Sequence, residues 1–146
     1  MKPPITQQLS NKILKLLSYR PRSVFEIKFR LKKITDSEKL INTTIKRFID
    51  KDLLNDQEFA SWWVDQRTTH RPKGNIALKS ELLQKGIDRD IINANLLDSK
   101  KEQKLAKKLI SSKKITNKKK AYQYLRARGF SSTSIFPAID ELGFEE

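Results

Sequence analysis

No cysteine occurs among the 146 residues, and histidine occurs once, at His70. The lack of cysteine excludes disulfide bonds, zinc fingers and thiol catalysis, and it fits a reducing compartment. The lone histidine stands beside Arg71 in a polar stretch, so we interpret it as a solvated turn residue. No glycine-rich loop leads into Lys-Ser or Lys-Thr, the pattern that cradles nucleotide phosphates. We therefore expect no cofactor and no metal site.

Clustered ligands for a metal and long apolar runs are also missing. Four acids lie close together in sequence, but they lack the glycine and the spacing of a calcium loop and are better explained by helix capping: Asp50, Asp52, Asp56 and Glu58. We find no catalytic constellation and expect a protein that is not an enzyme. No segment approaches the roughly 20 apolar residues of a membrane span, and the first ten residues lack the apolar run of a signal peptide. We expect a cytoplasmic protein without membrane contact.

Valine is scarce, and only four glycines and five prolines occur. Because apolar residues recur at helical spacing and nowhere alternate with polar ones, the sequence predicts an all-α fold. In the first third of the chain, helices are expected at about 6–18, at 23–34 and after a capping box at 35–38. The next three are expected from a capping signal at 55–58 to about 68, at 75–85 and after Asp88. The last three are expected from about 99 up to a polar turn at 111–117, at 118–128, and after Ser131 or Ser132 with Pro137 in the first turn.

Positive charge is what the chain has in excess, with 31 Lys and Arg against 17 Asp and Glu and a formal net charge of +14. Twelve of the basic residues and a single acid, Glu102, lie between Lys100 and Arg128. Such an excess predicts attraction to a polyanion, with nucleic acid as the first choice and an anionic membrane surface as the second.

An internal repeat runs through the chain. Arg20-Pro21 aligns with Arg71-Pro72 without gaps for fifteen residues, and a third copy matches Leu82 to Leu125, Lys85 to Arg128, Gly86 to Gly129, Ile87 to Phe130, Ile92 to Ile135 and Leu96 to Ile139. Self-similarity at this period is typical of tandem repeats whose neighbours complete each other's cores. We predict three three-helix repeats, similar to helix-turn-helix units, at 6–53, 54–98 and 99–143. Together they would form an elongated, curved body.

Several short motifs, in order, resemble the RecX regulatory proteins of bacteria. The motifs are Arg20-Pro21-Arg22-Ser23 with Glu26-Ile27, Leu54 to Ala60, Arg67, Gly74, Glu81-Leu82, Lys85-Gly86-Ile87 and Arg128-Gly129-Phe130. The resemblance covers residues 10 to 142. It departs from the family at 33–35, where Lys-Ile-Thr replaces the usual Lys-Gly before an apolar residue, and at Asn75, which replaces a frequent proline.

The resemblance implies a modulator of the RecA recombinase. Proteins of this family bind the RecA filament on single-stranded DNA along its helical groove, inhibit strand exchange and the coupled ATP hydrolysis, and bind DNA. The implied partners are the RecA recombinase filament and single-stranded DNA, with double-stranded DNA left open. Because no long exposed heptads occur, we expect a monomer.

The candidate contacts to DNA or to the filament are the basic residues of the predicted turns and second helices. They are Arg20, Arg22, Lys28, Lys32, Lys33, Arg67, Arg71, Lys73, Lys79, Lys118, Lys119, Lys120, Arg126 and Arg128. Contacts of such residues to phosphates are independent of sequence and sensitive to salt. Each of them is alternatively an ordinary solvated charge. Trp62 and Trp63 are candidates for base stacking or for the core. The competing hypothesis for the whole chain is a general nucleic-acid-binding helical protein without RecA specificity.

Overall fold

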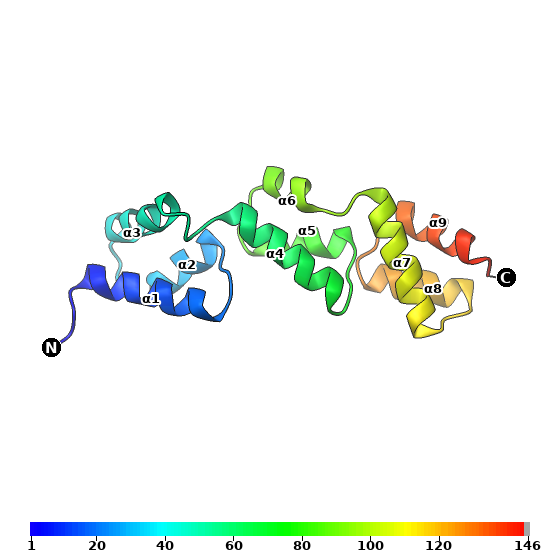
Figure 1. Cartoon of the computed structure of the whole chain (residues 1–146), viewed down its shortest axis with the longest axis horizontal. Helices are drawn as coiled ribbons and strands as arrows, with labels where there is room; N and C mark the ends of the chain where they lie inside the picture. Colours follow the sequence, from blue (N-terminus) through cyan, green and yellow to red (C-terminus); the bar gives the residue numbers. More distant parts are fainter. Residues whose placement is uncertain (145–146) are drawn as a thin grey trace.

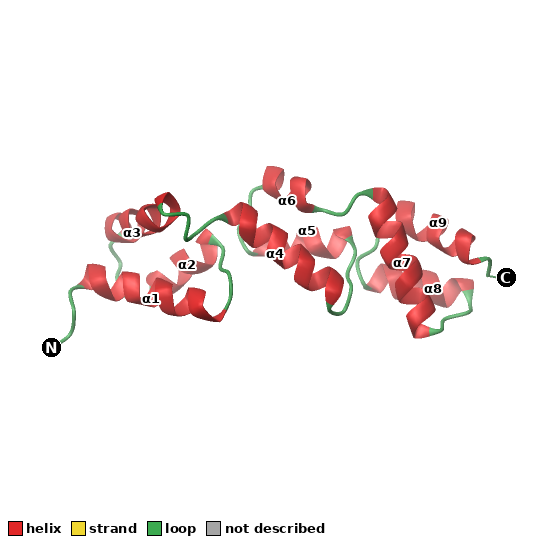
Figure 2. Cartoon of the chain, in the orientation of Figure 1, coloured by secondary structure: helices red, strands yellow, loops and turns green. Residues whose placement is uncertain are grey.

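The computed structural model describes residues 1–144, and within this range the backbone forms helices and no strands (Figures 1 and 2). The helices are α1 Ile5–Tyr19, α2 Val24–Leu31, α3 Glu38–Asp50, α4 Asp56–Thr69, α5 Asn75–Gln84, α6 Arg89–Asn95, α7 Ser99–Lys113, α8 Lys118–Ala127 and α9 Ser132–Leu142. The predicted all-α class is confirmed. None of the described helices is both long enough and apolar enough to cross a membrane.

Three consecutive sets of three helices follow one another along the long axis, with the termini at opposite ends (Figure 1). We call α1–α3, α4–α6 and α7–α9 the first, second and third repeats. Each repeat has its own hydrophobic core, centred on Leu9, Ile13, Ile27 and Leu31 in the first, on Phe59, Leu78, Leu82 and Ile92 in the second, and on Ile110, Leu125, Phe130 and Ile135 in the third. The predicted elongated body of tandem three-helix repeats is confirmed, whereas the boundaries at 6–53, 54–98 and 99–143 stay a prediction.

Side-chain caps determine where several helices begin. The predicted capping box at the start of α2 is present, because Ser23 Oγ accepts the N–H of Glu26 and Glu26 Oε1 accepts the N–H of Ser23, both at 3.1 Å. Asn55 and Asp88 cap α4 and α6 as predicted. Each cap satisfies a backbone N–H that has no partner within the helix.

Two helix ends of the first repeat differ from the prediction. The cap of α3 is Ser37, which accepts the N–H of Leu40 at 3.3 Å, and Thr35 instead accepts the N–H of Ser37. Helix α2 ends at Leu31 and not near Ile34, because the N–H groups of Ile34 and Thr35 both turn back to the carbonyl of Leu31. The intervening residues therefore form a tight turn.

The third repeat contains three further differences. Helix α7 continues to Lys113, into the predicted polar turn. Ser131 occupies the N-cap position of α9, but its side chain accepts no N–H of the helix, and its hydroxyl donates to Glu102 Oε1 at 2.7 Å. Pro137 is the sixth residue of α9 and not part of its first turn. The helix accommodates this proline even though a proline supplies no backbone N–H.

The backbones of the second and third repeats touch directly. The N–H of Gly74 donates to the carbonyl of Arg128 at 3.0 Å, and the N–H of Ile76 donates to the carbonyl of Gly129 at 2.9 Å. A Cβ atom added to Gly74 would lie 2.4 Å from Phe130 Cα, and one added to Gly129 would lie 2.3 Å from the Cβ of Ala77. Glycine is required at both positions for the two repeats to approach this closely.

The first and second repeats meet in a related way. The N–H of Val24, the first residue of α2, donates to Asp56 Oδ1 at 2.9 Å across the joint. Gly86 has a positive φ of 73°, and a Cβ atom added there would lie 2.4 Å from the Cβ of Phe25. The left-handed residue predicted at Gly86 is confirmed, and it lies against the neighbouring repeat.

Candidate nucleic-acid interface

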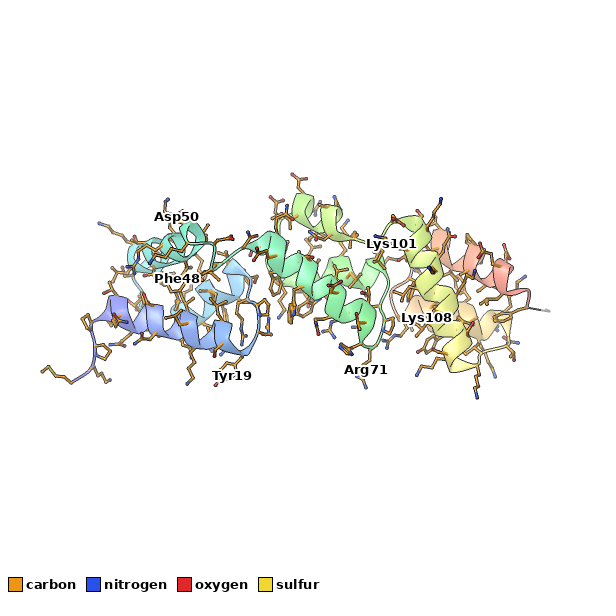
Figure 3. All side chains as sticks on the ribbon, in the orientation of Figure 1. Tyr19, Phe48, Asp50, Arg71, Lys101 and Lys108 are labelled. Atoms are coloured by element: carbon orange, nitrogen blue, oxygen red, sulfur yellow. The ribbon has the colours of Figure 1, made fainter. Side chains whose placement is uncertain are left out.

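The turns between the first and second helices of the three repeats lie on the same long side of the molecule (Figure 1). Figure 3 shows Tyr19 and Arg71 at two of these turns, with Asp50 on the opposite side. Arg71 and Lys114 both have a left-handed backbone, with φ of 54° and 56°. The repeat offsets that pair Arg20 with Arg71 and Leu82 with Leu125 also pair Arg71 with Lys114. Each turn therefore has a basic residue at an equivalent position.

In the first turn, Arg20 and Arg22 are held by the protein itself. Arg20 forms a two-pronged ion pair with Glu26, with distances of 3.2 and 2.5 Å. Arg22 Nε donates to the carbonyl of Leu16 at 3.2 Å. Burial, followed by the neighbouring charge of Arg20, lowers the pKa of Arg22 below its ordinary value. These two predicted contact residues lie in a partly buried positive environment.

The next predicted basic residues lie on α2 and after its last residue, at the end of the helix away from this turn. Lys32 and Lys33 are exposed, and Lys33 Nζ lies 5.2 Å from the centre of the exposed Phe29 ring. Lys28 is half-buried. A cation over an aromatic face is weakly attracted to it. Lys33 is therefore paired with an aromatic ring of its own repeat.

Glu81 organises the second turn. Its carboxylate receives Lys73 Nζ at 2.8 Å and Trp63 Nε1 at 3.0 Å. Arg67 Nε lies 3.2 Å from Glu81 Oε1, close enough for an ion pair although this nitrogen makes no hydrogen bond. Two predicted contact residues, Arg67 and Lys73, are therefore half-buried partners of one carboxylate, while Arg71 and Lys79 are exposed.

The tryptophans belong to the packing of the second repeat. Trp62 and Trp63 are half-buried and form a cluster with Phe59, with ring centres 5.8 to 6.2 Å apart. Cations lie over both, Arg20 at 6.0 Å from Trp62 and Arg67 at 4.8 Å from Trp63. Of the two roles considered for these residues, the core role matches their surroundings.

In the third repeat, a run of three lysines follows the third turn. Asn117 caps α8 by accepting the N–H of Lys120 at 2.9 Å. Lys119 and Lys120 are exposed, and Lys118 is half-buried. The first turn of α8 contains no acid. Lysines near a helix N-terminus face the positive end of the helix dipole, which is unfavourable unless an anion is close.

Arg128 connects the third repeat to the second turn. Its guanidinium donates to the carbonyls of Pro72 at 3.1 Å and of Arg71 at 2.7 Å. Arg128 is half-buried, whereas the nearby Arg126 is exposed. The equivalent residue of the second repeat, Lys85, reaches back to Glu26 of the first repeat at 3.2 Å. Both side chains therefore tie a repeat to the one before it.

The predicted contact residues thus fall into two groups. Seven are exposed and able to meet a partner: Lys32, Lys33, Arg71, Lys79, Lys119, Lys120 and Arg126. Five are half-buried with intramolecular partners: Arg20, Arg22, Arg67, Lys73 and Arg128. Lys28 and Lys118 are half-buried as well. The side chains of the second group are therefore held by the protein itself, whereas those of the first group face solvent.

Sequence reasoning missed Lys114 and Lys85. Lys114 occupies the left-handed position of the third turn, and Lys85 bridges two repeats. The signal for both was available, because the repeat alignment pairs Lys114 with Arg71 and Lys85 with Arg128. The carboxylates Glu26 and Glu81 stood in the motifs of the resemblance, but the sequence did not show which basic residues they hold; Lys85, for example, lies 59 residues from Glu26.

The lone histidine and the clustered acids of the sequence form no metal site in the part of the chain that the structure describes. Among residues 1–144, no group of three or more His, Cys, Asp or Glu side chains could hold a metal ion. His70 is exposed at the end of α4. Asp56 accepts a backbone N–H, and Asp52 accepts Asn55 Nδ2 at 3.2 Å.

The fold and the site together define a tandem three-helix-repeat protein with basic turns along one side. Residues 55–96 match the family model described as RecX, second three-helix domain. The "Regulatory protein RecX" of Chlorobium phaeobacteroides is 33% identical over 88% of this chain and 89% of its own length. A crystal structure of RecX from Lactobacillus salivarius superposes with a TM-score of 0.79 at 30% identity, over 94% of this chain and 96% of that chain. The chain belongs to the RecX family of regulatory proteins.

Relatives in this family differ in length. The "Regulatory protein RecX" of Bacillus subtilis is 37% identical over 92% of this chain, but the match spans 55% of the relative. The matched part of two mycobacterial relatives spans 46% of their length. The chain thus corresponds to about half of several curated relatives and to most of the Chlorobium protein.

Proposed function

We propose that this chain is a regulator of the RecA recombinase. It binds the RecA filament on single-stranded DNA, inhibits strand exchange and the coupled ATP hydrolysis, and itself binds DNA in a salt-dependent manner. Membership of the RecX family carries the proposal, because relatives that match nearly the whole chain are named as regulatory proteins. The chain acts as a cytoplasmic binding protein and not as an enzyme. It works as a monomer whose three repeats, at 6–53, 54–98 and 99–143, follow the filament.

The shape and charge of the molecule support this proposal. An elongated body with a basic residue at each of three turns suits a long polyanion or a filament groove better than a small ligand. Arg71 and Lys114 adopt a left-handed backbone that is unfavourable for residues other than glycine. The proposed contact surface consists of the exposed basic residues on this side.

The test is to add the purified chain to RecA on single-stranded DNA and to follow ATP hydrolysis and strand exchange. We expect both rates to fall at low molar excess over RecA. A double variant, Arg71→Glu with Lys114→Glu, is expected to inhibit less. The matched control, Lys46→Glu with Lys51→Glu, alters two exposed lysines of the first repeat near Asp50 and is expected to inhibit like the wild type.

The second candidate function is general nucleic-acid binding without RecA specificity. The net charge of +14 favours it independently of the family. Strong binding to DNA, together with unchanged ATP hydrolysis and strand exchange, would establish this second function and overturn the first.

A further inference from the structure

A groove in the third repeat remains outside the surface described above. It lies between α8 and α9, has a volume of about 540 Å³, and is lined by residues that include Lys118, Lys119, Tyr122, Phe136 and Asp140. Its floor includes Ile139, which is buried. Pockets for small planar ligands commonly have volumes of about 300–1,000 Å³. The groove is therefore large enough for a nucleotide.

The groove has an aromatic wall with an open face. Phe136 is 55% exposed and stacks on Tyr122, with ring centres 5.2 Å apart and planes inclined by 26°. The hydroxyl of Tyr122 lies 3.3 Å from Ser132 Oγ, a contact that holds the tip of the Tyr122 ring. The core of the third repeat uses Ile135 and Ile139 of α9, so Phe136 points away from it. The exposed side of the Phe136 ring is therefore a flat apolar surface.

The rim of the groove is basic. Lys118 and Lys119 line it, Lys120 follows them, and the first turn of α8 contains no acid. Asp140 is the acid among the lining residues. Positive charge beside a flat apolar face complements a nucleotide, whose base is planar and whose phosphate is negative. A purely apolar partner would not complement this positive charge.

We propose that this groove binds one nucleotide of a single-stranded nucleic acid, with the base stacked on the open face of Phe136 and the phosphate held by Lys118 and Lys119. Base–aromatic stacking tolerates any base, because every base has a π-face. In a duplex the bases are already stacked on one another, so the groove favours single strands. The inference rests on the DNA binding included in the proposed function.

The test compares the binding of two fluorescent oligonucleotides of equal length and charge at fixed salt. One is oligodeoxythymidine, and the other has the same backbone without bases. We expect the wild type to prefer the base-containing strand by about fivefold or more, in line with stacking on one aromatic ring. Phe136→Leu keeps the apolar bulk but removes the flat face, so this preference should disappear. Phe136→Tyr keeps the ring and should retain the preference.

Phe29→Leu is the matched control, since Phe29 is 57% exposed and also lies beside a lysine. This variant should keep the wild-type preference. A second readout uses single-stranded DNA with 5-iodouracil, which on irradiation should crosslink to the peptide containing Phe136. Equal preference in the wild type and Phe136→Leu, or equal losses in Phe136→Leu and Phe29→Leu, would overturn the groove proposal.

The outcomes separate this inference from the proposed function. If the wild type binds single-stranded DNA and inhibits RecA but Phe136→Leu keeps its base preference, only the groove proposal fails. If the base preference depends on Phe136 but RecA is not inhibited, the groove stands and RecA regulation fails. The alternative occupant of the groove is a second copy of this chain, which analytical ultracentrifugation without DNA would detect as a dimer. A dimer that Phe136→Leu abolishes would overturn the nucleotide proposal.

Discussion

Glu102 is 2% exposed although it lies in the most basic part of the chain. Its carboxylate accepts the N–H of Asn75 at 2.6 Å and the hydroxyl of Ser131 at 2.7 Å, so one side chain connects the second and third repeats. Asn75 stands where the family resemblance leads us to expect a proline, and a proline has no N–H to donate. The amide of Asn75 also exchanges hydrogen bonds with the backbone of Leu97.

Glu102→Gln should lower the free energy of unfolding by about 1–3 kcal/mol, because glutamine has one acceptor oxygen and leaves one of the two buried donors without a partner. Urea unfolding followed by circular dichroism measures the change. Glu141→Gln is the control, since Glu141 is an exposed partner of Lys107 and should cost much less. Equal costs for the two variants would contradict the bridging role of Glu102.

Glu26 and Glu81 are the other carboxylates that hold basic residues in place. For each, burial alone would raise the pKa, but hydrogen bonds outweigh burial and lower the pKa below its ordinary value of 4.5. The donors to Glu26 are Arg20, the N–H of Ser23 and Lys85, and the donors to Glu81 are Lys73 and Trp63. Asp56 behaves oppositely, because its burial outweighs the hydrogen bond from Val24 and raises its pKa.

The stability of the protein should therefore fall in acid. A lowered pKa in the folded state contributes stability that is present above the unfolded value of 4.5 and is lost as the pH falls through the folded value. The raised pKa of Asp56 opposes this trend. We expect the double variant Glu26→Gln with Glu81→Gln to lose less stability than the wild type between pH 7 and about pH 3 in urea unfolding. The exposed Glu38→Gln should follow the wild type, and identical curves for all three would refute this assignment.

At the scale of elements, local signals predicted helix starts better than helix ends. The capping box of Ser23 and Glu26 depends on residues three apart, so the sequence contained it in full. Ser131 was a candidate cap without a glutamate three residues later; its side chain accepts no N–H of α9, and its hydroxyl donates to Glu102 of another helix. The end of α2 was set by backbone groups that turn back to Leu31. A tertiary or turn contact that competes for the same group cannot be read from the local sequence.

Glycine is needed at helix ends either for a positive φ or for close approach of another backbone, and three glycines of this chain allow the two effects to be compared. Gly143 has a positive φ of 67° with no atom within 4 Å of an added Cβ, so Gly143→Ala should cost about 1 kcal/mol. Gly74 has an ordinary φ of −88° but touches the backbone of Phe130, so Gly74→Ala should cost about 1–3 kcal/mol. Gly129 combines both features, and its substitution by alanine should cost about the sum.

Thermal and urea unfolding of the three alanine variants measure these costs. Equal losses at Gly74 and Gly143 would show that the close approach between repeats contributes nothing beyond backbone strain. Losses confined to the two joint positions would show instead that the backbone conformation at Gly143 is of little consequence.

At the scale of the whole molecule, three repeats in a row bring their basic turns to one side (Figure 1). The second and third repeats carry Arg71 and Lys114 at equivalent left-handed positions. The lysine run 118–120 adds charge at one end of this side. A surface of this kind gives affinity for phosphates that depends on salt concentration.

Changing Lys118, Lys119 and Lys120 together to glutamine should flatten the salt dependence of single-stranded DNA binding. If all three contact phosphates, the slope of log affinity against log salt should fall in magnitude by about two, at about 0.7 per contact. Fluorescence anisotropy at several salt concentrations measures the slope. The control changes Lys39, Lys46 and Lys51 to glutamine, which removes the same charge from exposed positions of the first repeat. The slope of this control should stay steeper than that of the first variant. An unchanged slope in the first variant would mean that this cluster contacts no phosphates.

The sequence by itself determined the helical class, the repeated unit and its family, because helical periodicity, capping and the spacing of Lys85-Gly86 and Arg128-Gly129 are local patterns that survive along the chain. Only the tertiary structure decided which basic residues are exposed and can contact a binding partner. In sequence, nothing distinguishes Arg67, Lys73 and Arg128 from the exposed Arg71 and Lys119. In the folded chain, Arg128 is held by the carbonyl of Pro72, and Arg67 and Lys73 are held by Glu81. Burial and pairing depend on neighbours that are distant in sequence, and those neighbours are brought together only by folding.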